Sequence, residues 1–515
     1  MGKFCLLSET GEDLTPPSMK ARGLLAFLLM SPEFTRPRSA LTATLWSDRG
    51  ETQARNSLRH ALSEIRTALG AHDWVFKTDR KSVGFAPNTI ERDVDSAPPS
   101  ARHDFLEDVN PKDPVFAEWL ADRRREFAEN LRQSEEPLLS IHAHGDRELL
   151  HSAVLVDGIA QGLSSWCARK IATSEAPGED APSADAPPFV LDSYFSNGDD
   201  TVAVHLSLAT TAPRKPLWNR PTVLTKDANA LLEQHEIHQL INQSVDRTIF
   251  EIAPPQREFD ESKYLKSGAL GAMRLIFRNQ NGDLEAARKQ LDRNFALDPR
   301  GIYAAWKAYI LTLYRGERDG TDVKALREEA DALVRKALEL DPYDAMTLAL
   351  CSYVQSYLLG NKETGFDLAS RSIDMNRSNP LAWAFRGAAK FNVGRSEEAY
   401  RDITFARKIS GEGPYRYVLD AFACVAAALT DRLDEAAVYG EISNALSPGY
   451  RAPLRYLAAI YAARGEHDKL ESTLNRIREF EPGFTLEMLE EASYPVQSLR
   501  NSAASVRRLS GRSDL

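Results

Sequence analysis

Apolar positions recur with a helical period through the second half of the chain. From about residue 260 onward, Ala- and Leu-rich amphipathic stretches follow one another, and Pro380, Pro414, Pro448 and Pro482 close them at intervals of 34 residues. This period is typical of a helix pair that cannot bury its apolar face alone, so consecutive pairs must stack. The pattern therefore predicts an α-solenoid over residues 256–515, with five or six helix pairs and a C-terminal capping helix.

Residue types within one repeating unit support this stacking. Trp383 supplies an aromatic side chain, Gly387 a small residue at a helix crossing, Gly394 a turn, and Ala399 and Ala406 small packing residues. A unit with this order resembles the tetratricopeptide repeat, which implies a superhelix whose concave face binds a protein or peptide. Six residues are candidates to line that face, the alternative being that they pack or are solvated: Tyr415, Arg416, Tyr417, Tyr450, Arg451 and Tyr456.

The first hundred residues have shorter amphipathic stretches separated by polar turns. Residues 3–7 have a strand-like pattern, and helices are expected over residues 19–30, 35–46 and 51–69. On the third helix, apolar residues recur at steps of three and four, which predicts one buried face. This stripe comprises Ala54, Leu58, Ala61, Leu62, Ile65 and Leu69.

The opposite face of the third helix is rich in cationic and amide side chains that project together. An α-helix fits the major groove of DNA, where Arg pairs with guanine and Asn with adenine. The alternative is a polar face that is merely solvated. The residues concerned are Arg55, Asn56, Arg59, His60, Ser63 and Arg66.

A β-hairpin is expected next to this helix. Two short apolar runs, residues 74–77 and 83–85, enclose a polar tip that contains Arg80 and Lys81. Such a hairpin is placed as a wing to contact DNA phosphates. Arg36 and Arg38 add two further cationic candidates at the start of the second helix.

Charge is distributed unevenly along the chain. The segment from residue 20 to residue 85 has eleven Lys and Arg against six acidic residues, a local charge of +5 on a chain whose net charge is −10. A basic segment on an acidic chain indicates a nucleic-acid contact confined to one end.

Residues 4–85 resemble the response-regulator type of winged helix, in the variant used by Streptomyces antibiotic regulatory proteins. Residues 104–125 are similar to the opening of the bacterial transcriptional activator domain that follows it in that family, but only one helix of that domain is expected here. The family implies sequence-specific binding of double-stranded DNA by the third helix and regulation of transcription, with half-sites bound by dimers or tandem protomers. The runs that carry the resemblance are residues 20–28, 45–46, 54–59, 65–70, 104–106 and 113–120.

The middle of the chain lacks the repeat pattern and mixes strands with helices. Asn197-Gly198 lies between two alternating runs and favours a hairpin. The segment is similar to the small α/β domain between winged helices and tetratricopeptide repeats in regulators related to acid-response activators and adenylate-cyclase-associated proteins. Strands are expected over 138–141, 189–195 and 201–209, helices over 157–171 and 227–249, and a flexible loop over 173–188.

His142, His144, Asp146 and His151 have the residue types of a metal site. A short His-x-His on a loop is more often solvated surface, so we predict no metal and no cofactor. The sequence contains neither a Gly-x-x-x-x-Gly-Lys-Ser/Thr loop nor a Gly-x-Ser-x-Gly nucleophile elbow. We therefore expect no enzymatic activity.

Composition indicates a cytoplasmic protein. The four cysteines are far apart and form no Cys-x-x-Cys pair, which suits a reducing compartment. The longest apolar runs, such as residues 24–30, are far shorter than the roughly 18 residues of a membrane span. The amino terminus has no basic region followed by an apolar signal core.

Together these observations predict a multidomain, mainly α protein that regulates transcription by binding specific DNA sequences. Its partners would be double-stranded DNA and a protein or peptide bound by the repeats, with self-association into a homodimer as a further possibility and no membrane contact. The alternative is a scaffold or adaptor that does not bind DNA. The expected parts are an α+β winged helix (1–98), a helical activator-like segment (99–135), a small α/β domain (136–255) and the tetratricopeptide-repeat solenoid (256–515).

Overall fold

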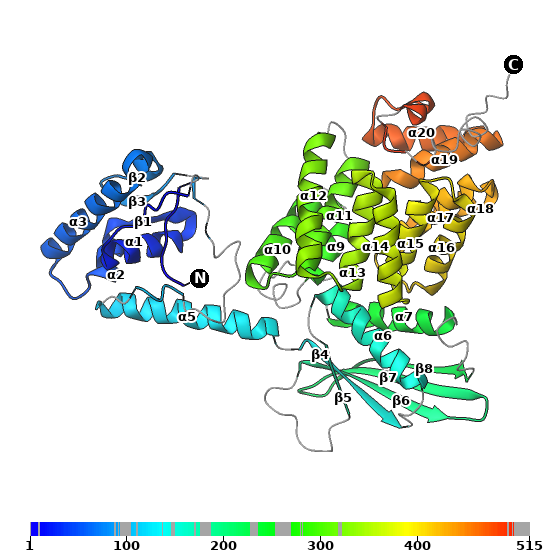
Figure 1. Cartoon of the computed structure of the whole chain (residues 1–515), viewed down its shortest axis with the longest axis horizontal. Helices are drawn as coiled ribbons and strands as arrows, with labels where there is room; N and C mark the ends of the chain where they lie inside the picture. The colour runs from blue at the N-terminus through cyan, green and yellow to red at the C-terminus, as the bar shows by residue number, and fades with distance from the viewer. Residues whose placement is uncertain are drawn as a thin grey trace. The chain divides into compact units, whose positions relative to one another are not determined.

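The computed structural model describes residues 2–8, 11–86, 89–90, 92, 105–109, 112–135, 137–145, 150–168, 171–175, 187–226, 235–252, 269–278, 280, 282–317, 322–491, 494–496 and 498. Most of these residues are helical, and others form two small sheets of three and five strands. The chain divides into two compact units (Figure 1). Unit one comprises Met1–Glu135 and Asp292–Pro299, and unit two comprises Glu136–Leu291 and Arg300–Leu515. Within the described ranges, every helix is too short or too polar to cross a membrane.

Three helices and a three-stranded sheet form the first part of unit one. The helices are α1 (Met19–Leu29), α2 (Arg38–Leu45) and α3 (Glu51–Leu69), with short 3-10 turns η1 (Pro32–Phe34) and η2 (Gly70–Val75). The antiparallel strands β1 (Thr35–Pro37), β2 (Phe76–Thr78) and β3 (Ser82–Phe85) lie in the order β1-β3-β2.

Helix α3 confirms the predicted bounds and the predicted apolar stripe. All six stripe residues are buried, and the helix ends at Gly70, whose φ of 53° lies in the left-handed region that favours glycine. The expected hairpin is also present as β2 and β3.

Two local predictions for this unit are wrong. The helix expected from residue 35 begins at Arg38, because Thr35–Pro37 pairs with β3 and Pro37 has extended backbone angles. Proline also disfavours helical geometry in the residue that precedes it, here Arg36. Residues 3–7 form no strand, and the chain there has only the isolated bridges Gly2 to Phe105 and Leu7 to Asp13.

Helix α5 (Pro114–Glu135) completes the core of unit one. Phe116 is fully buried, and Leu120 is 3% exposed within the same apolar cluster as α1, α2 and α3. Phe116 fits against Gly23, where an added Cβ would lie 3.1 Å from its ring. Residues expected to form two segments, 1–98 and 99–135, thus contribute to one core in the described ranges.

Unit two begins with a five-stranded sheet that two helices cover on one face (Figure 1). β4 runs parallel to β5 and to β6, while β6, β7 and β8 are antiparallel, giving the order β5-β4-β6-β7-β8. The elements are β4 (Leu139–Gly145), α6 (Leu150–Cys167), β5 (Ile171–Glu175), β6 (Phe189–Asn197), β7 (Thr201–Thr210), β8 (Pro216–Thr225) and α7 (His235–Ile252).

The structure corrects the predicted helix over 157–171. That helix starts earlier and ends at Cys167, because Ile171–Glu175 pairs with β4 as a strand that local periodicity did not reveal. The predicted loop over 173–188 overlaps β5, and its residues 176–186 lie outside the described ranges. Residues 227–234 of the other predicted helix also lie outside the described ranges. That helix is described from His235 as α7.

The second half is helical, as predicted. In the described residues its helices follow one another as six pairs, with a π-helical turn, η3 (Val354–Leu359), and a 3-10 turn, η4 (Leu486–Glu490). The pairs are α9 (Leu270–Arg278) with α10 (Asp283–Leu297), α11 (Gly301–Glu317) with α12 (Val323–Leu340), α13 (Ala345–Tyr353) with α14 (Lys362–Met375), α15 (Pro380–Phe391) with α16 (Ser396–Ile409), α17 (Arg416–Leu429) with α18 (Leu433–Leu446), and α19 (Arg451–Arg464) with α20 (His467–Phe480).

Each recurring proline follows a completed helix pair, and none is the last residue of a helix. Pro380 occupies the first turn of α15, directly after the N-cap Asn379, whereas Pro414, Pro448 and Pro482 lie in turns. Proline is tolerated in a first helical turn, where its missing N–H has no helical acceptor. The expected C-terminal capping helix over 498–515 lies almost wholly outside the described residues.

Gly387 allows α15 and α16 to approach closely. A Cβ at this position would lie 2.5 Å from Cγ1 of Ile403 and 3.1 Å from the carbonyl oxygen of Ala399. We expect Gly387→Ala to lower the free energy of unfolding by about 1–3 kcal/mol, because the helices must move apart. Urea denaturation of the full chain measures this change. Gly449→Ala is the control, since no atom lies within 4 Å of an added Cβ there, and an equal loss in both variants would contradict the packing argument.

A buried carboxyl group joins α7 to the turn between α16 and α17. Asp246 accepts hydrogen bonds from the Gly413 backbone N–H and, at 3.5 Å, from the Tyr415 hydroxyl. Burial raises the pKa of Asp246 from 3.8 to about 7. Between pH 3.8 and about 7, Asp246 therefore keeps its proton in the folded chain, whereas it has lost that proton in the unfolded chain.

Stability should consequently fall as the pH rises through this window, by about 1.4 kcal/mol per pH unit at the steepest. Urea unfolding at a series of pH values, compared between the wild type and Asp246→Asn, measures this slope. The amide cannot titrate, so the variant should lose that part of the slope. An unchanged slope in Asp246→Asn would contradict the assignment.

Candidate nucleic-acid interface

The polar face of α3 is exposed along its length. Arg55, Asn56, Arg59, His60, Ser63 and Arg66 are all exposed, whereas the stripe on the other side of the helix is buried. We call these six residues the α3 ridge. Sequence periodicity predicted both faces, because in an amphipathic helix the burial of one face determines which residues lie on the other.

Two arginines of the α3 ridge have partners within the chain. Arg55 forms an ion pair with Glu51 one turn earlier. Arg66 donates a hydrogen bond of 2.5 Å to the Thr78 hydroxyl and lies 3.6 Å from the carboxylate of Asp73. Arg66 thereby connects α3 to the hairpin.

Arg59 lies between these two and differs from them. In the described part of the chain its guanidinium has no hydrogen-bond or ion-pair partner, and neither do the side chains of Asn56 and His60. An exposed arginine with all its donors available suits a bidentate contact with guanine or phosphate.

The tip of the hairpin is fixed by Asp79. Its carboxylate accepts hydrogen bonds from the backbone N–H groups of Ser82 and Lys81 and from the Ser82 hydroxyl, and these bonds lower the pKa of Asp79. Arg80 and Lys81 are left exposed on this ordered turn. Two cations on a fixed tip are suited to contacts with the DNA backbone.

Arg38 and Arg36 have internal contacts that the sequence did not reveal. Arg38 donates from Nε to the Asp79 carbonyl at 2.7 Å and from its backbone N–H to the Lys81 carbonyl at 2.8 Å, so it holds the tip. Arg36 donates to the Ser31 hydroxyl at 2.8 Å and stacks 5.5 Å above the Phe27 ring. Both side chains are half-buried and support the module, while Arg59, Arg80 and Lys81 are exposed cations whose side chains have no partner in the described part of the chain.

Glu64 positions α3 against α1. Its two carboxylate oxygens accept the backbone N–H and the hydroxyl of Ser18, each at 2.7 Å, and the same hydroxyl caps α1 by accepting the Ala21 N–H. No local pattern indicates a pair separated by 46 residues.

A second candidate site is a pocket among the odd-numbered helices of the array. Its cavity volume is about 80 Å³, and it is lined by aromatic side chains together with Glu317 and Arg455. Of the six groove candidates from the sequence, only Tyr450 and Tyr456 line it. The other aromatic walls include Tyr309, Tyr353, Tyr357 and Phe422.

The charged groups at this pocket are paired. Arg455, only 2% exposed, donates to Glu481 at 2.5 Å and to the Gly316 carbonyl at 2.7 Å, and Tyr494 donates to the other Glu481 oxygen. Glu317 accepts the Arg451 backbone N–H at 2.8 Å, and burial raises the pKa of Glu317. The pocket thus combines aromatic walls with a carboxyl group that binds a proton more readily than usual.

The histidines considered as metal ligands are only partly brought together. His142 and His144 lie near Asp192, whereas His151 contacts the Thr225 carbonyl oxygen at 2.9 Å. Asp146 lies outside the described residues.

Comparisons with known proteins leave the family open. No protein-family profile matches the chain, and no curated protein matches it. Among solved structures, a monomeric mutant of IFIT1 with Gppp-AAAA is similar to 53% of this chain at 12% sequence identity and a TM-score of 0.36. This chain spans 64% of that protein's length.

Proposed function

We propose that this protein regulates transcription by binding specific sequences of double-stranded DNA. In this proposal residues 1–98 act as a winged helix of the type used by Streptomyces antibiotic regulatory proteins. Helix α3 enters the major groove, and the hairpin tip contacts phosphates. The exposed α3 ridge, with Arg59 free at its centre and Arg80 and Lys81 beside it, carries the proposal.

The order of elements supports this assignment. A helix, a short strand, two helices and a hairpin follow one another, and the short strand β1 joins the hairpin in one sheet. The contact between Arg66 and Thr78 couples α3 to the hairpin. A rigid connection of this kind fixes which groove and which phosphates are reached together.

We further propose that the helix pairs of residues 256–515 are tetratricopeptide repeats that bind a protein or peptide as the regulatory input. The pocket lined by Tyr309, Tyr353 and Tyr450 supports this part, since aromatic walls provide large contact areas for a bound segment. Self-association of two chains through the same array would serve the same purpose, because it would place two DNA-binding modules on paired half-sites.

Selection of binding sites from a random pool of DNA duplexes tests the DNA-binding proposal with the full-length chain. We expect enrichment of a defined sequence motif, and binding to that motif should weaken as salt increases because phosphate contacts release counterions. Binding without any enriched motif, or no binding at moderate salt, would contradict the proposal. Partners captured equally well after nuclease treatment, together with absent DNA binding, would instead favour the scaffold or adaptor function.

A further inference from the structure

One face of the five-stranded sheet is not covered by α6 or α7 (Figure 1). Polar side chains of β4 and β6 project from the sheet as one group. β4 and β6 are parallel neighbours in which His142 pairs with Asp192 and His144 with Tyr194. Alternate residues of a strand point to the same face, so His142, His144 and Asp192 project together. Pairing between strands 48 residues apart creates this group, which is why the sequence did not indicate Asp192.

The potential ligand atoms of these three residues already converge. Nε2 of His144 lies 2.9 Å and Nδ1 of His142 3.7 Å from the same Asp192 oxygen, Oδ1. All three ligand atoms lie within 4.8 Å of one another. In a tetrahedral zinc site with bonds of about 2.0–2.1 Å, ligand atoms are about 3.3 Å apart. The separations of 2.9 and 3.7 Å at Asp192 Oδ1 lie on either side of that value.

The Asp192 carboxylate has a contact at each of its two oxygens. The Asp192 side chain is almost fully buried. Arg214 pairs with Oδ2, so that Oδ1 is left to the two imidazoles. An arginine on the outer oxygen is the kind of second contact that orients a ligating carboxylate.

The imidazole of His144 is also held in place by a ring contact. It stacks on Tyr194 with centroids 4.4 Å apart and planes inclined by 14°. Since Arg214 already balances the charge of Asp192, two imidazoles directed at the other oxygen are not required for charge balance. Convergent imidazole and carboxylate groups on a half-exposed surface are typical ligands of Zn²⁺.

We propose that His142, His144 and Asp192 bind a Zn²⁺ ion, with one coordination position left open. The site lies on the α/β domain and is independent of the proposed DNA binding. An open position would allow the bound metal to take an anionic or imidazole-containing ligand.

Zinc binding to the full-length chain, produced without a polyhistidine tag, tests this proposal. Competition with a chromophoric chelator measures the affinity, and Co²⁺ gives visible absorption bands that report a tetrahedral site. We expect a single zinc ion per chain, and His144→Ala or His142→Ala should weaken binding at least about tenfold. Zinc should also raise the unfolding temperature of the wild type, because it binds only the folded state.

His205→Ala is the matched control. His205 lies on the same face and stacks on Tyr194 at 5.9 Å, but it is outside the ligand set. Its replacement should leave zinc affinity and the Co²⁺ spectrum unchanged. Absence of zinc binding in the folded wild type, or unchanged binding in the His142→Ala/His144→Ala double variant, would overturn the proposal. Circular dichroism of each variant distinguishes loss of ligand from loss of fold.

Discussion

Replacing Arg59 by alanine is expected to weaken binding to the selected DNA motif by about 1–3 kcal/mol, or roughly 5- to 150-fold. Arg59 is exposed at the centre of the α3 ridge and has no partner among the described residues, so its removal costs no internal contact. If Arg59 contacts a base, preference at one position of the motif should relax while the rest is kept. Arg59→Glu should reduce binding further, because it places a negative charge against phosphate.

Fluorescence anisotropy with the full-length variants and labelled duplexes provides this measurement. Arg335→Ala is the control, since Arg335 is an exposed helical arginine of unit two whose removal changes the net charge equally. A uniform loss across all sequences, with a reduced salt dependence, would indicate a phosphate contact at Arg59 instead of a base contact. Equal affinity of wild type and Arg59→Glu would exclude α3 as the DNA-binding element.

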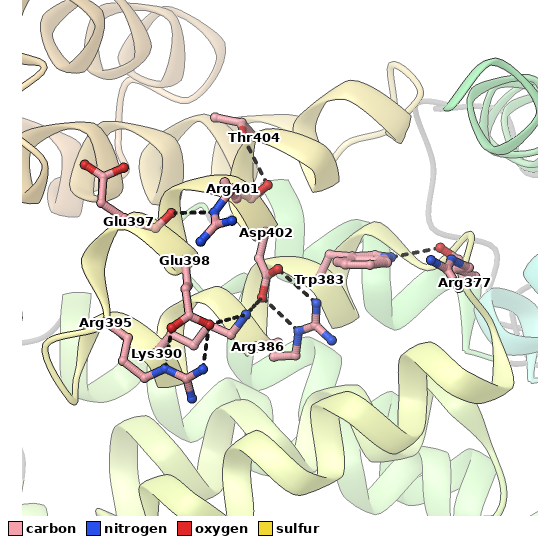
Figure 2. Close-up of polar contacts among 10 residues, drawn as sticks. All are labelled: Arg377, Trp383, Arg386, Lys390, Arg395, Glu397, Glu398, Arg401, Asp402 and Thr404. Carbon is pink, nitrogen blue, oxygen red and sulfur yellow. Dashed lines mark hydrogen bonds and ion pairs between the residues drawn. The ribbon is translucent and has the colours of Figure 1, made fainter. Parts of the chain in front are cut away.

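The second large effect concerns a buried ion cluster between α15 and α16 (Figure 2). Asp402 accepts two hydrogen bonds from Arg386, at 2.8 and 2.9 Å, and pairs with Lys390 at 2.7 Å. The Asp402 and Lys390 side chains are each 8% exposed. We expect Asp402→Ala to lower the free energy of unfolding by about 3–5 kcal/mol. The variant removes the carboxylate that Arg386 and Lys390 share, and little water can reach the two cations to replace it.

Urea denaturation followed by circular dichroism measures this loss. Glu397 on the same helix provides the comparison, since it pairs with Arg432 at 3.1 Å but is largely exposed. Glu397→Gln should cost at most about 1 kcal/mol, the usual range of a surface ion pair. Similar costs for the two variants would show that burial does not determine the strength of the cluster. Glu398 pairs with both Arg395 and Lys390 in Figure 2, and this contact remains in the Asp402 variant.

Elements whose evidence is local were predictable from the sequence. Helix α3 has a full apolar stripe and a terminal Gly70, and its bounds follow from these features alone. The stacked helix pairs follow from a repeat of 34 residues, which reports the size of a structural unit. In both cases the information lies within one turn, one helix or one repeat.

Elements that depend on distant pairing were not predictable in this way. β1 forms because Thr35–Pro37 meets β3, where a helix was predicted, and β5 forms because Ile171–Glu175 meets β4, mostly where a loop was predicted. In each case a partner strand elsewhere in the chain decides the structure. Contacts at the candidate sites follow the same rule. Arg38 contacts Asp79 across 41 residues, and the aromatic pocket collects side chains from helices that the sequence does not show to be adjacent.

The packing of α5 bears on how this part of the chain can be divided. Phe116 and Leu120 are part of the interior around α1, so a fragment that stopped near residue 98 would leave that interior open to water on one side. Such a fragment would lose cooperativity and tend to aggregate. Helix α5 therefore belongs to the same folding unit as the helices and hairpin proposed to bind DNA.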